Sequence, residues 1–329
     1  MRSSARIACG IGVLAALGCG GAPSPAPPPA ILSGTIVSNP GGAPVPGAQI
    51  LSGETRLALT AADGRFSFPN TGPIPVSIAA EGHLTRQTRI SGDRADLVID
   101  LIALAPPFSL EYYRQLARNA QDGGGGRPLE LSVWPVNPAA YIFTNRITPE
   151  HADTGEPLPQ YLVDLCRGAL PGIVSQVTAG RLTLARVESG TDTQVLRSGR
   201  DGFIVITFRT RTRLSSEQGP TDCVDSASRG SGNSADVNLC YSPESVSGCT
   251  LISPGVIAHE VGHALGLHHA CFPWAPVRAP YTMCTGSGSA AGRRCEAAFD
   301  PKELFHSAIM YSRPRGNADP DEDPPSFGF

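Results

Sequence analysis

Three histidines and one glutamate near residue 260 have the spacing of a metal-dependent hydrolytic site. The segment that begins at His259 reads HEVGHALGLHH. In a helix, His259 and His263 lie one turn apart on the same face, so both imidazoles can reach one metal ion. Gly266 can adopt the left-handed conformation that ends a helix, and the turn would bring His269 round as the third ligand. His268 is the alternative third ligand, but the spacing from the glycine favours His269.

Three neutral imidazoles leave the fourth tetrahedral position open for water, which is the arrangement of a catalytic rather than a structural zinc ion. Zinc can lower the pKa of that water to roughly 7. Glu260 follows the first ligand and is expected to act as the general base. It would accept a proton as the water attacks a peptide carbonyl and then protonate the leaving amine.

The residues around these four predict the helix that positions them. Ser253 is a suitable N-cap, and Pro254 suits the first helical position. Ile257, Val261 and Leu265 repeat every four residues, so they are expected to form the buried face.

These residues resemble the metzincin zinc endopeptidases, whose pattern is HExxHxxGxxH. The resemblance implies a methionine turn beneath the zinc ion, and residues 307–312, with Met310, look like that turn; the other reading of Met310 is plain core filler. Ile309-Met310-Tyr311 is similar to the matrixin form, whereas the cysteines between His269 and Met310 resemble the pappalysin-like branch, so the subfamily stays open. The expected cofactor is one zinc ion. Calcium is common in the family, but no loop here has a convincing ligand spacing.

Beyond Cys9 and Cys19 the chain has seven cysteines, which points to an oxidising compartment. Six of them could form three disulfide bonds in any of about fifteen ways. Cys166 lies inside a helical apolar stripe and is expected to be the unpaired one. The others are Cys223, Cys240, Cys249, Cys271, Cys284 and Cys295.

The N-terminus predicts export from a bacterial cell. Residues 1–18 carry two arginines followed by a short apolar run, which is typical of a signal peptide. Its end resembles the bacterial lipoprotein box, which implies lipid attachment at Cys19 and a place in the cell envelope; cleavage nearby and free secretion is the alternative. Residues 19–30 are rich in proline and are expected to be a stiff linker.

Residues 31–104 are predicted to be an all-β sandwich, because short alternating runs are separated by turn residues. The predicted strands are 31–37, 48–51, 65–68, 74–79 and 97–101. Segments such as Ala62-Asp63-Gly64-Arg65-Phe66 resemble the carboxypeptidase regulatory-like family, which implies a spacer or docking domain without chemistry.

Residues 105–312 are predicted to be an α+β catalytic domain of the metzincin type, which makes the whole chain a multidomain protein. Helices are expected over 110–119 and over 160–177, the second broken near Pro171. Strands are expected over 129–136, 182–187, 203–208 and 236–241, with 203–208 central. Residues 313–329, rich in Pro, Asp and Gly, are expected to be a disordered tail.

Composition excludes several other classes. The chain has 329 residues with 37 glycines and 31 prolines, but no Gly-X-Y period, so it is not collagen-like. With a formal net charge of −3 and no basic block, nothing in the sequence indicates a nucleic-acid surface, and no nucleic-acid partner is expected. After the leader, no segment is apolar for long enough to span a membrane.

The sequence therefore predicts an exported, monomeric zinc endopeptidase acting on a peptide or protein. An extended substrate would pair with an edge strand, for which 236–241 is the candidate. Two alternatives stay open: a surface adhesin that holds zinc without turnover, and a narrow processing enzyme for one partner protein.

Overall fold

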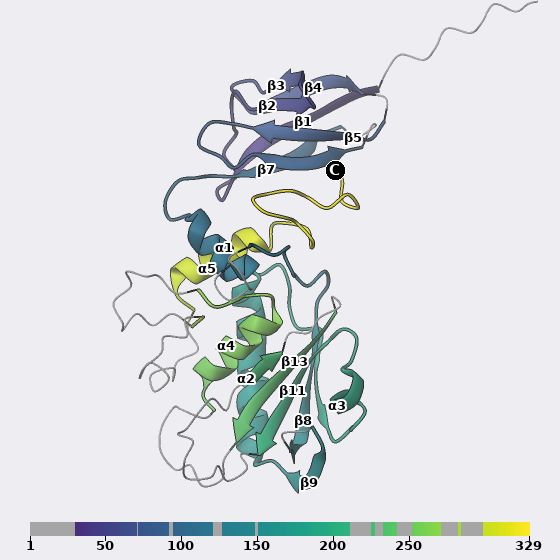
Figure 1. Cartoon of the computed structure of the whole chain (residues 1–329), viewed down its shortest axis with the longest axis vertical. Helices are drawn as coiled ribbons and strands as arrows, with labels where there is room; N and C mark the ends of the chain where they lie inside the picture. The colour runs from purple at the N-terminus through teal and green to yellow at the C-terminus, as the bar shows by residue number, and fades with distance from the viewer. Residues whose placement is uncertain are drawn as a thin grey trace, which may run out of the picture.

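The computed structural model of the chain describes residues 30–70, 72–91, 95–120, 127–148, 151–210, 225–227, 233–241, 252–270, 282–283 and 299–329. They form a mixed, β-rich α+β structure, in which a part made of strands is followed by a part with both helices and a sheet (Figure 1). The predicted signal peptide, lipid-attachment site and linker lie outside the described residues, except for Ala30. None of the helices described has the length and apolar character needed to span a membrane.

The first seven strands form two sheets around one apolar core. They are β1 (Ala30–Asn39), β2 (Gln49–Ser52), β3 (Thr55–Leu59), β4 (Arg65–Asn70), β5 (Ile74–Ala79), β6 (Arg86–Ile90) and β7 (Leu97–Ile102). One sheet has the order β4-β1-β7 and the other β3-β2-β5-β6. Alternate side chains point inward, so that Leu32 and Ile36 of β1 meet Ile78 of β5 in the core. All five strands predicted in this region are present; β3 and β6 were not predicted.

A sheet of six strands is the framework of the second part. Its strands are β8 (Ala139–Ile147), β9 (Asp153–Pro157), β10 (Val187–Gly190), β11 (Phe203–Thr210), β12 (Asp225–Ala227) and β13 (Ser234–Tyr241). The order is β10-β8-β11-β13-β12, and β9 pairs with β8. Strands β10, β8, β11 and β13 run parallel, and β12 is antiparallel. The predicted central strand is confirmed, because β11 is paired on both sides.

Helices cover both faces of this sheet. They are α2 (Gln160–Val177), α3 (Val195–Ser198) and α4 (Pro254–Ala264), while α1 (Leu110–Arg118) and α5 (Pro301–Met310) pack on each other nearer the first part (Figure 1). Ile204 and Ile206 of β11 share a core with α2 and α4. Phe203 and Val205 point to the opposite face, where Val195 of α3 covers them.

Three sequence predictions differ from the structure in this part. Helix α2 is continuous, with Pro171 inside it, because its buried apolar face outweighs the cost of one proline. Residues 129–136 form no strand; Leu131 instead exchanges backbone hydrogen bonds with Gly316 and Asn317. The strand expected over 182–187 begins only at Val187.

Residues 313–329, termed the C-terminal segment below, are ordered, so the prediction of a disordered tail is wrong. The segment lies between the two parts of the molecule (Figure 1). Just before it, Ser312 accepts a hydrogen bond of 2.7 Å from Asn39 of β1. Within it, Asp323 pairs with the buried Arg86 of β6 at 2.9 Å. The segment has few apolar residues, and buried ion pairs rather than apolar contacts hold it in place.

The segment also extends the sheet at the edge strand β6. Gln87 donates its backbone N–H to Asp321 and accepts one from Asp323, at 3.0 and 2.8 Å. The Phe329 N–H donates to the Arg89 carbonyl at 3.0 Å, and the Ser91 N–H donates to the Phe329 carbonyl at 2.9 Å. Backbone groups along the outer edge of β6 therefore have hydrogen-bond partners from the C-terminal segment of the same chain.

Candidate metal centre

Helix α4 begins as the sequence predicts. The Ser253 side chain accepts a hydrogen bond of 3.2 Å from the N–H of Val256, and Pro254 occupies the first helical position. The three residues predicted to face the core are fully buried: Ile257, Val261 and Leu265. They anchor α4 against α2 and the neighbouring strands.

Helix α4 ends in a Schellman motif at Gly266. The Gly266 N–H bonds to the His263 carbonyl and the Leu267 N–H to the Gly262 carbonyl, both at 2.9 Å. Gly266 has φ of +93°, and a Cβ there would lie 2.4 Å from the carbonyl oxygen of Ser132. Both the backbone angle and the available space therefore require glycine, which confirms its predicted role.

Two aromatic side chains hold the end of α4 from outside the helix. Trp134 Nε1 donates to the Ala264 carbonyl at 2.7 Å, and the Tyr311 hydroxyl donates to the Leu265 carbonyl at 2.8 Å. These bonds satisfy carbonyls that a helix end leaves without partners. Neither contact could be predicted from the sequence, since nothing in the local pattern of Trp134 or Tyr311 shows which distant carbonyl it reaches.

Met310 packs against the turn that follows α4. It is the last residue of α5 and is fully buried. Its methyl carbon is 4.0 Å from the position that a Cβ on Gly266 would occupy. The predicted methionine therefore lies next to the turn that leads to His269.

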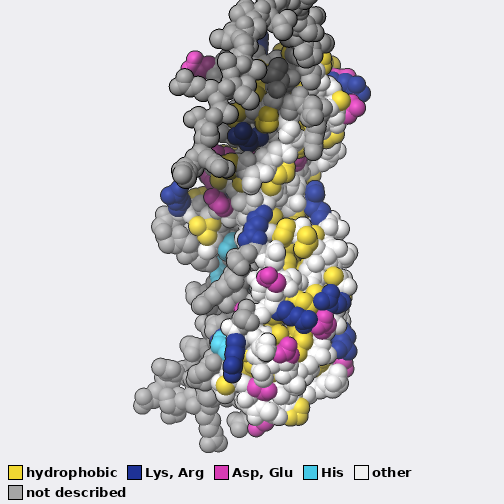
Figure 2. Space-filling view, turned by 90° about the vertical axis from the view of Figure 1, so that its right-hand side faces the viewer, with side chains coloured by type: hydrophobic (Ala, Val, Ile, Leu, Met, Phe, Trp, Pro, Cys, Tyr) yellow, Lys and Arg dark blue, Asp and Glu magenta, His cyan; other side chains and the backbone are white. Residues whose placement is uncertain are grey.

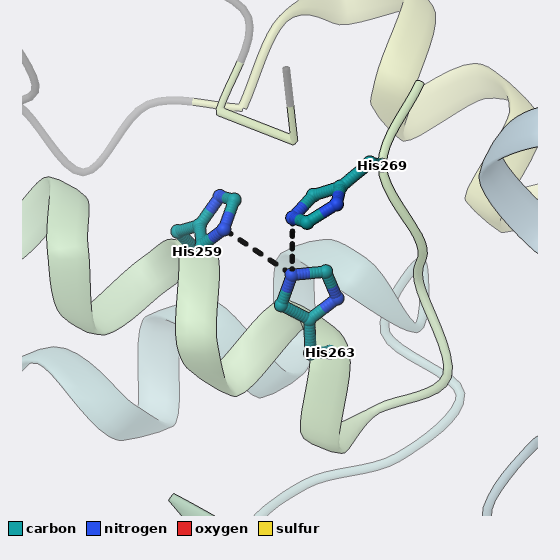
Figure 3. A group of neighbouring side chains, drawn as sticks. All are labelled: His259, His263 and His269. Carbon is teal, nitrogen blue, oxygen red and sulfur yellow. Dashed lines mark hydrogen bonds between the residues drawn. The ribbon is translucent and has the colours of Figure 1, made fainter. Parts of the chain in front are cut away.

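The three predicted histidine ligands come together. His259 and His263 extend from α4, and His269 reaches them from the chain that returns after the turn (Figure 3). Their Nε2 atoms are 3.2 Å apart for His259 and His263, and 3.0 Å apart for His263 and His269. Ligand nitrogens around a tetrahedral zinc ion, with bonds of about 2.0–2.1 Å, are separated by roughly 3.3 Å. The three could therefore hold a metal ion, and His268 is not part of the group.

The hydrogen bonds of Nδ1 in His259 and His263 determine whether Nε2 of each ring is free of hydrogen and able to bind a metal ion. His259 Nδ1 lies 2.5 Å from the Thr282 carbonyl oxygen, and His263 Nδ1 lies 2.8 Å from that of Leu267. A carbonyl only accepts, so each Nδ1 carries the hydrogen. In the neutral rings both Nε2 atoms then carry lone pairs, and the two atoms lie 3.2 Å apart. This is the tautomer that metal-binding histidines adopt, with a backbone oxygen fixing the ring from behind.

Glu260 lies beside this group without belonging to it. Its side chain is buried, and its Oε1 is 3.7 Å from His259 Nε2. A carboxylate in this place can take up or release a proton next to the histidine nitrogens. His259 is buried, whereas His263 and His269 are only half-buried.

Behind the site, the buried Glu303 accepts three backbone hydrogen bonds. They come from Met283 at 2.7 Å, Asp300 at 2.8 Å and Thr282 at 3.2 Å. Burial raises the pKa of Glu303 to about 7, although the three N–H donors act in the opposite direction. Glu303 was not predicted as a site residue. Its capping box with Asp300 is readable from the sequence, but the contact with residues 282–283 is not.

His306 lies apart from the metal-binding group. It is fully buried between α5 and α1. Its Nδ1 donates to the Lys302 carbonyl at 2.7 Å, and its Nε2 accepts from the Ser109 N–H at 3.0 Å. Burial lowers the pKa of His306 to about 4.

Cys166 is free and buried in α2, as predicted. Burial raises the pKa of its thiol to about 12. Cys240 lies in β13, and the other five cysteines expected to form disulfide bonds lie outside the described residues.

The strand expected to bind substrate is not at the edge. β13 pairs with β11 on one side and, over Asp236–Asn238, with β12 on the other. The expectation of an open edge there is wrong, because β12 covers it.

On the face seen in Figure 2, basic and acidic side chains are interspersed with hydrophobic side chains, shown in yellow. No family model matches the chain, and no curated protein sequence matches it. Among solved structures, the C-terminal domain of the PapC usher aligns with 22% of this chain and 98% of its own, at 18% identity and a TM-score of 0.19. A likeness at that level carries no argument about fold or function.

Proposed function

We propose that this chain is an exported zinc-dependent endopeptidase of the metzincin type. His259, His263 and His269 bind the metal ion, and Glu260 is the general base. In this proposal residues 105–312 are the catalytic domain, and residues 31–104 are a spacer or docking domain of the carboxypeptidase regulatory-like type. The leader and Cys19 carry the protein to the cell envelope.

The observation that carries the proposal is the set of inward-facing nitrogens. His259 and His263 each use Nδ1 as a donor to a backbone carbonyl, so their Nε2 lone pairs converge at 3.2 Å. Two lone pairs at that distance repel unless a proton or a metal ion lies between them. A third imidazole nitrogen at 3.0 Å favours the metal ion, and an all-nitrogen set suits zinc.

In the proposed mechanism, the metal site and Glu260 have separate roles. When bound, zinc would act as a Lewis acid that polarises the substrate carbonyl and lowers the pKa of the attacking water. Glu260 accepts the proton of that water on its carboxylate and passes it to the amine that leaves. The buried position of Glu260 limits competing solvent, and the half-buried His263 and His269 leave room for a peptide to approach.

The test compares residues 31–329 with two variants in a digest of a diverse peptide library. Wild type should bind one zinc ion per chain and cleave. Glu260→Ala should keep the zinc ion and lose cleavage, because it removes the base but no ligand. His263→Ala should lose both.

Cleavage by Glu260→Ala at the wild-type rate would overturn the assignment of the base. Zinc bound without cleavage by any form, including on an unfolded protein such as casein, would overturn the proposal of a general endopeptidase. A wild-type chain that binds no zinc would overturn the metal centre itself.

A further inference from the structure

Residues 282 and 283 contact three places in the metal centre: His259, Gly262 of α4 and the residue that follows His269. The Met283 carbonyl accepts a hydrogen bond of 3.0 Å from the N–H of Ala270, the residue directly after His269. The fully buried Met283 side chain packs on Gly262 of α4, where its sulfur would be 2.8 Å from an added Cβ. The Thr282 carbonyl, in turn, contacts His259 Nδ1 at 2.5 Å.

One side chain of α5 holds this pair of residues from behind. Glu303 Oε1 accepts the N–H of Met283, and its Oε2 accepts the N–H of Thr282. The same Oε2 accepts the Asp300 N–H, which ties the carboxylate to the start of its own helix. Glu303 is fully buried, so these bonds do not compete with solvent.

We infer that Glu303 is a positioning residue for the metal ligand His259: its carboxylate fixes the backbone of Thr282 and Met283, and the Thr282 carbonyl then sets the tautomer and the angle of the imidazole. The inference rests on the metal centre of the proposed function, but not on peptide cleavage. It assigns to α5 a role in metal binding besides carrying Met310.

The geometry explains why this contact matters for His259. A histidine side chain can rotate about its own bonds, and only its outer nitrogen is free to be held when the other binds a metal. The partner of His263 Nδ1 is the carbonyl of Leu267, four residues further along the chain. The Schellman motif already fixes Leu267, because its N–H is bonded to the Gly262 carbonyl. The partner of His259 Nδ1 is not on the same helical turn, because Thr282 lies 23 residues away in the sequence. The position of that partner depends on packing between elements, and Glu303 of α5 contacts its backbone N–H.

The test is Glu303→Gln in residues 31–329, with zinc affinity measured by competition with a chelator. Glutamine is neutral and has the same shape, so burial does not oppose it. Its amide can accept with only one oxygen, and the amide nitrogen faces at least one backbone N–H. We expect zinc affinity to fall about 10- to 100-fold, the usual effect of removing a group that orients a ligand. With Co²⁺ in place of zinc, the visible absorption bands should also shift.

The matched control is Glu111→Gln, which removes an exposed carboxylate from the first turn of α1 and should leave zinc affinity unchanged. Melting of the metal-free proteins separates folding from positioning, and affinity is measured well below both midpoints. If Glu303→Gln does not fold, Glu303→Asp, which keeps the charge but is one carbon too short, is measured in its place with the same expectation.

Wild-type affinity and an unchanged Co²⁺ spectrum in a folded Glu303 variant would overturn the inference. That result differs from failure of the proposed function, which is seen in the wild type as absence of zinc or of cleavage. A wild type that binds zinc without cleaving still tests the role of Glu303.

Discussion

Arg313 and Asp321 form a bidentate ion pair in which neither side chain is exposed. Arg313 Nε and Nη2 donate to the two carboxylate oxygens at 2.7 and 2.9 Å. Arg313 also reaches Asp100 of β7 at 2.6 Å, so one guanidinium joins the C-terminal segment to the first part of the molecule. The same carboxylate of Asp100 accepts from Asn39.

Replacing Arg313 should therefore destabilise the whole chain. Arg313→Met leaves Asp321 buried without its cation, which typically costs about 3–5 kcal/mol in the free energy of unfolding. Urea denaturation measures the change. The control is Arg65→Met, whose pair with Asp63 is exposed on both sides and should change stability by less than about 1 kcal/mol. Equal effects of the two substitutions would contradict the assignment.

Gly266→Ala should impair both stability and metal binding. A residue with a side chain is strained at φ of +93°, and the Cβ would also collide with Ser132. We expect a loss of about 1–3 kcal/mol from the backbone alone and weaker zinc binding, because the turn brings in His269. Gly168→Ala in α2 has open space and an ordinary φ, so it should stabilise by roughly 0.5–1 kcal/mol. Calorimetry of both variants checks the difference.

His306 should make stability depend on pH in mildly acidic solution. Its pKa is lowered from 6.5 to about 4 in the folded chain, so between these values the unfolded chain binds more protons. The contribution of His306 is complete above pH 6.5 and is lost as the pH falls to about 4, by up to about 3 kcal/mol.

The measurement is the difference in unfolding free energy between wild type and His306→Gln, with chelator present so that the metal ligands titrate equally in both. That difference should shrink as the pH is lowered. A difference that stays constant from pH 7 to pH 4.5 would show that His306 titrates normally.

The Cys166 thiol should not react in the native protein. Burial keeps it protonated, with a pKa of about 12, and only the thiolate is alkylated. Iodoacetamide followed by peptide mapping should leave Cys166 unmodified in buffer and modify it in urea. Rapid modification in buffer would mean that α2 opens locally.

The parts of the site that follow from local sequence could be predicted. The four-residue spacing of His259 and His263, the cap at Ser253 and the turn at Gly266 all depend on neighbours within one or two helical turns. The third histidine follows from the same turn. These features need no knowledge of the rest of the chain.

The parts that depend on distant partners could not be predicted. Residues 313–329 have the composition of a disordered tail, but Asp321 and Asp323 find buried arginines that the local sequence does not reveal. β13 has the pattern of a strand, yet its place inside the sheet depends on β12. Glu303 is recognisable as a capping residue, but the hydrogen bond that it accepts from the Thr282 N–H depends on how α5 packs. Long-range pairing decides each of these.

The contact between Phe329 and β6 has a consequence for the order in which the molecule matures. A chain is synthesised from its N-terminus, so the strands β1 to β7 are complete long before residues 321–329 appear. Until residues 321–329 are made, the backbone groups of Gln87, Arg89 and the adjacent Ser91 lack the partners that this segment later provides. During that interval the first part of the molecule has an open strand edge, which favours pairing with other chains. Residues 321–329 thus protect the edge of a sheet whose strands were made first.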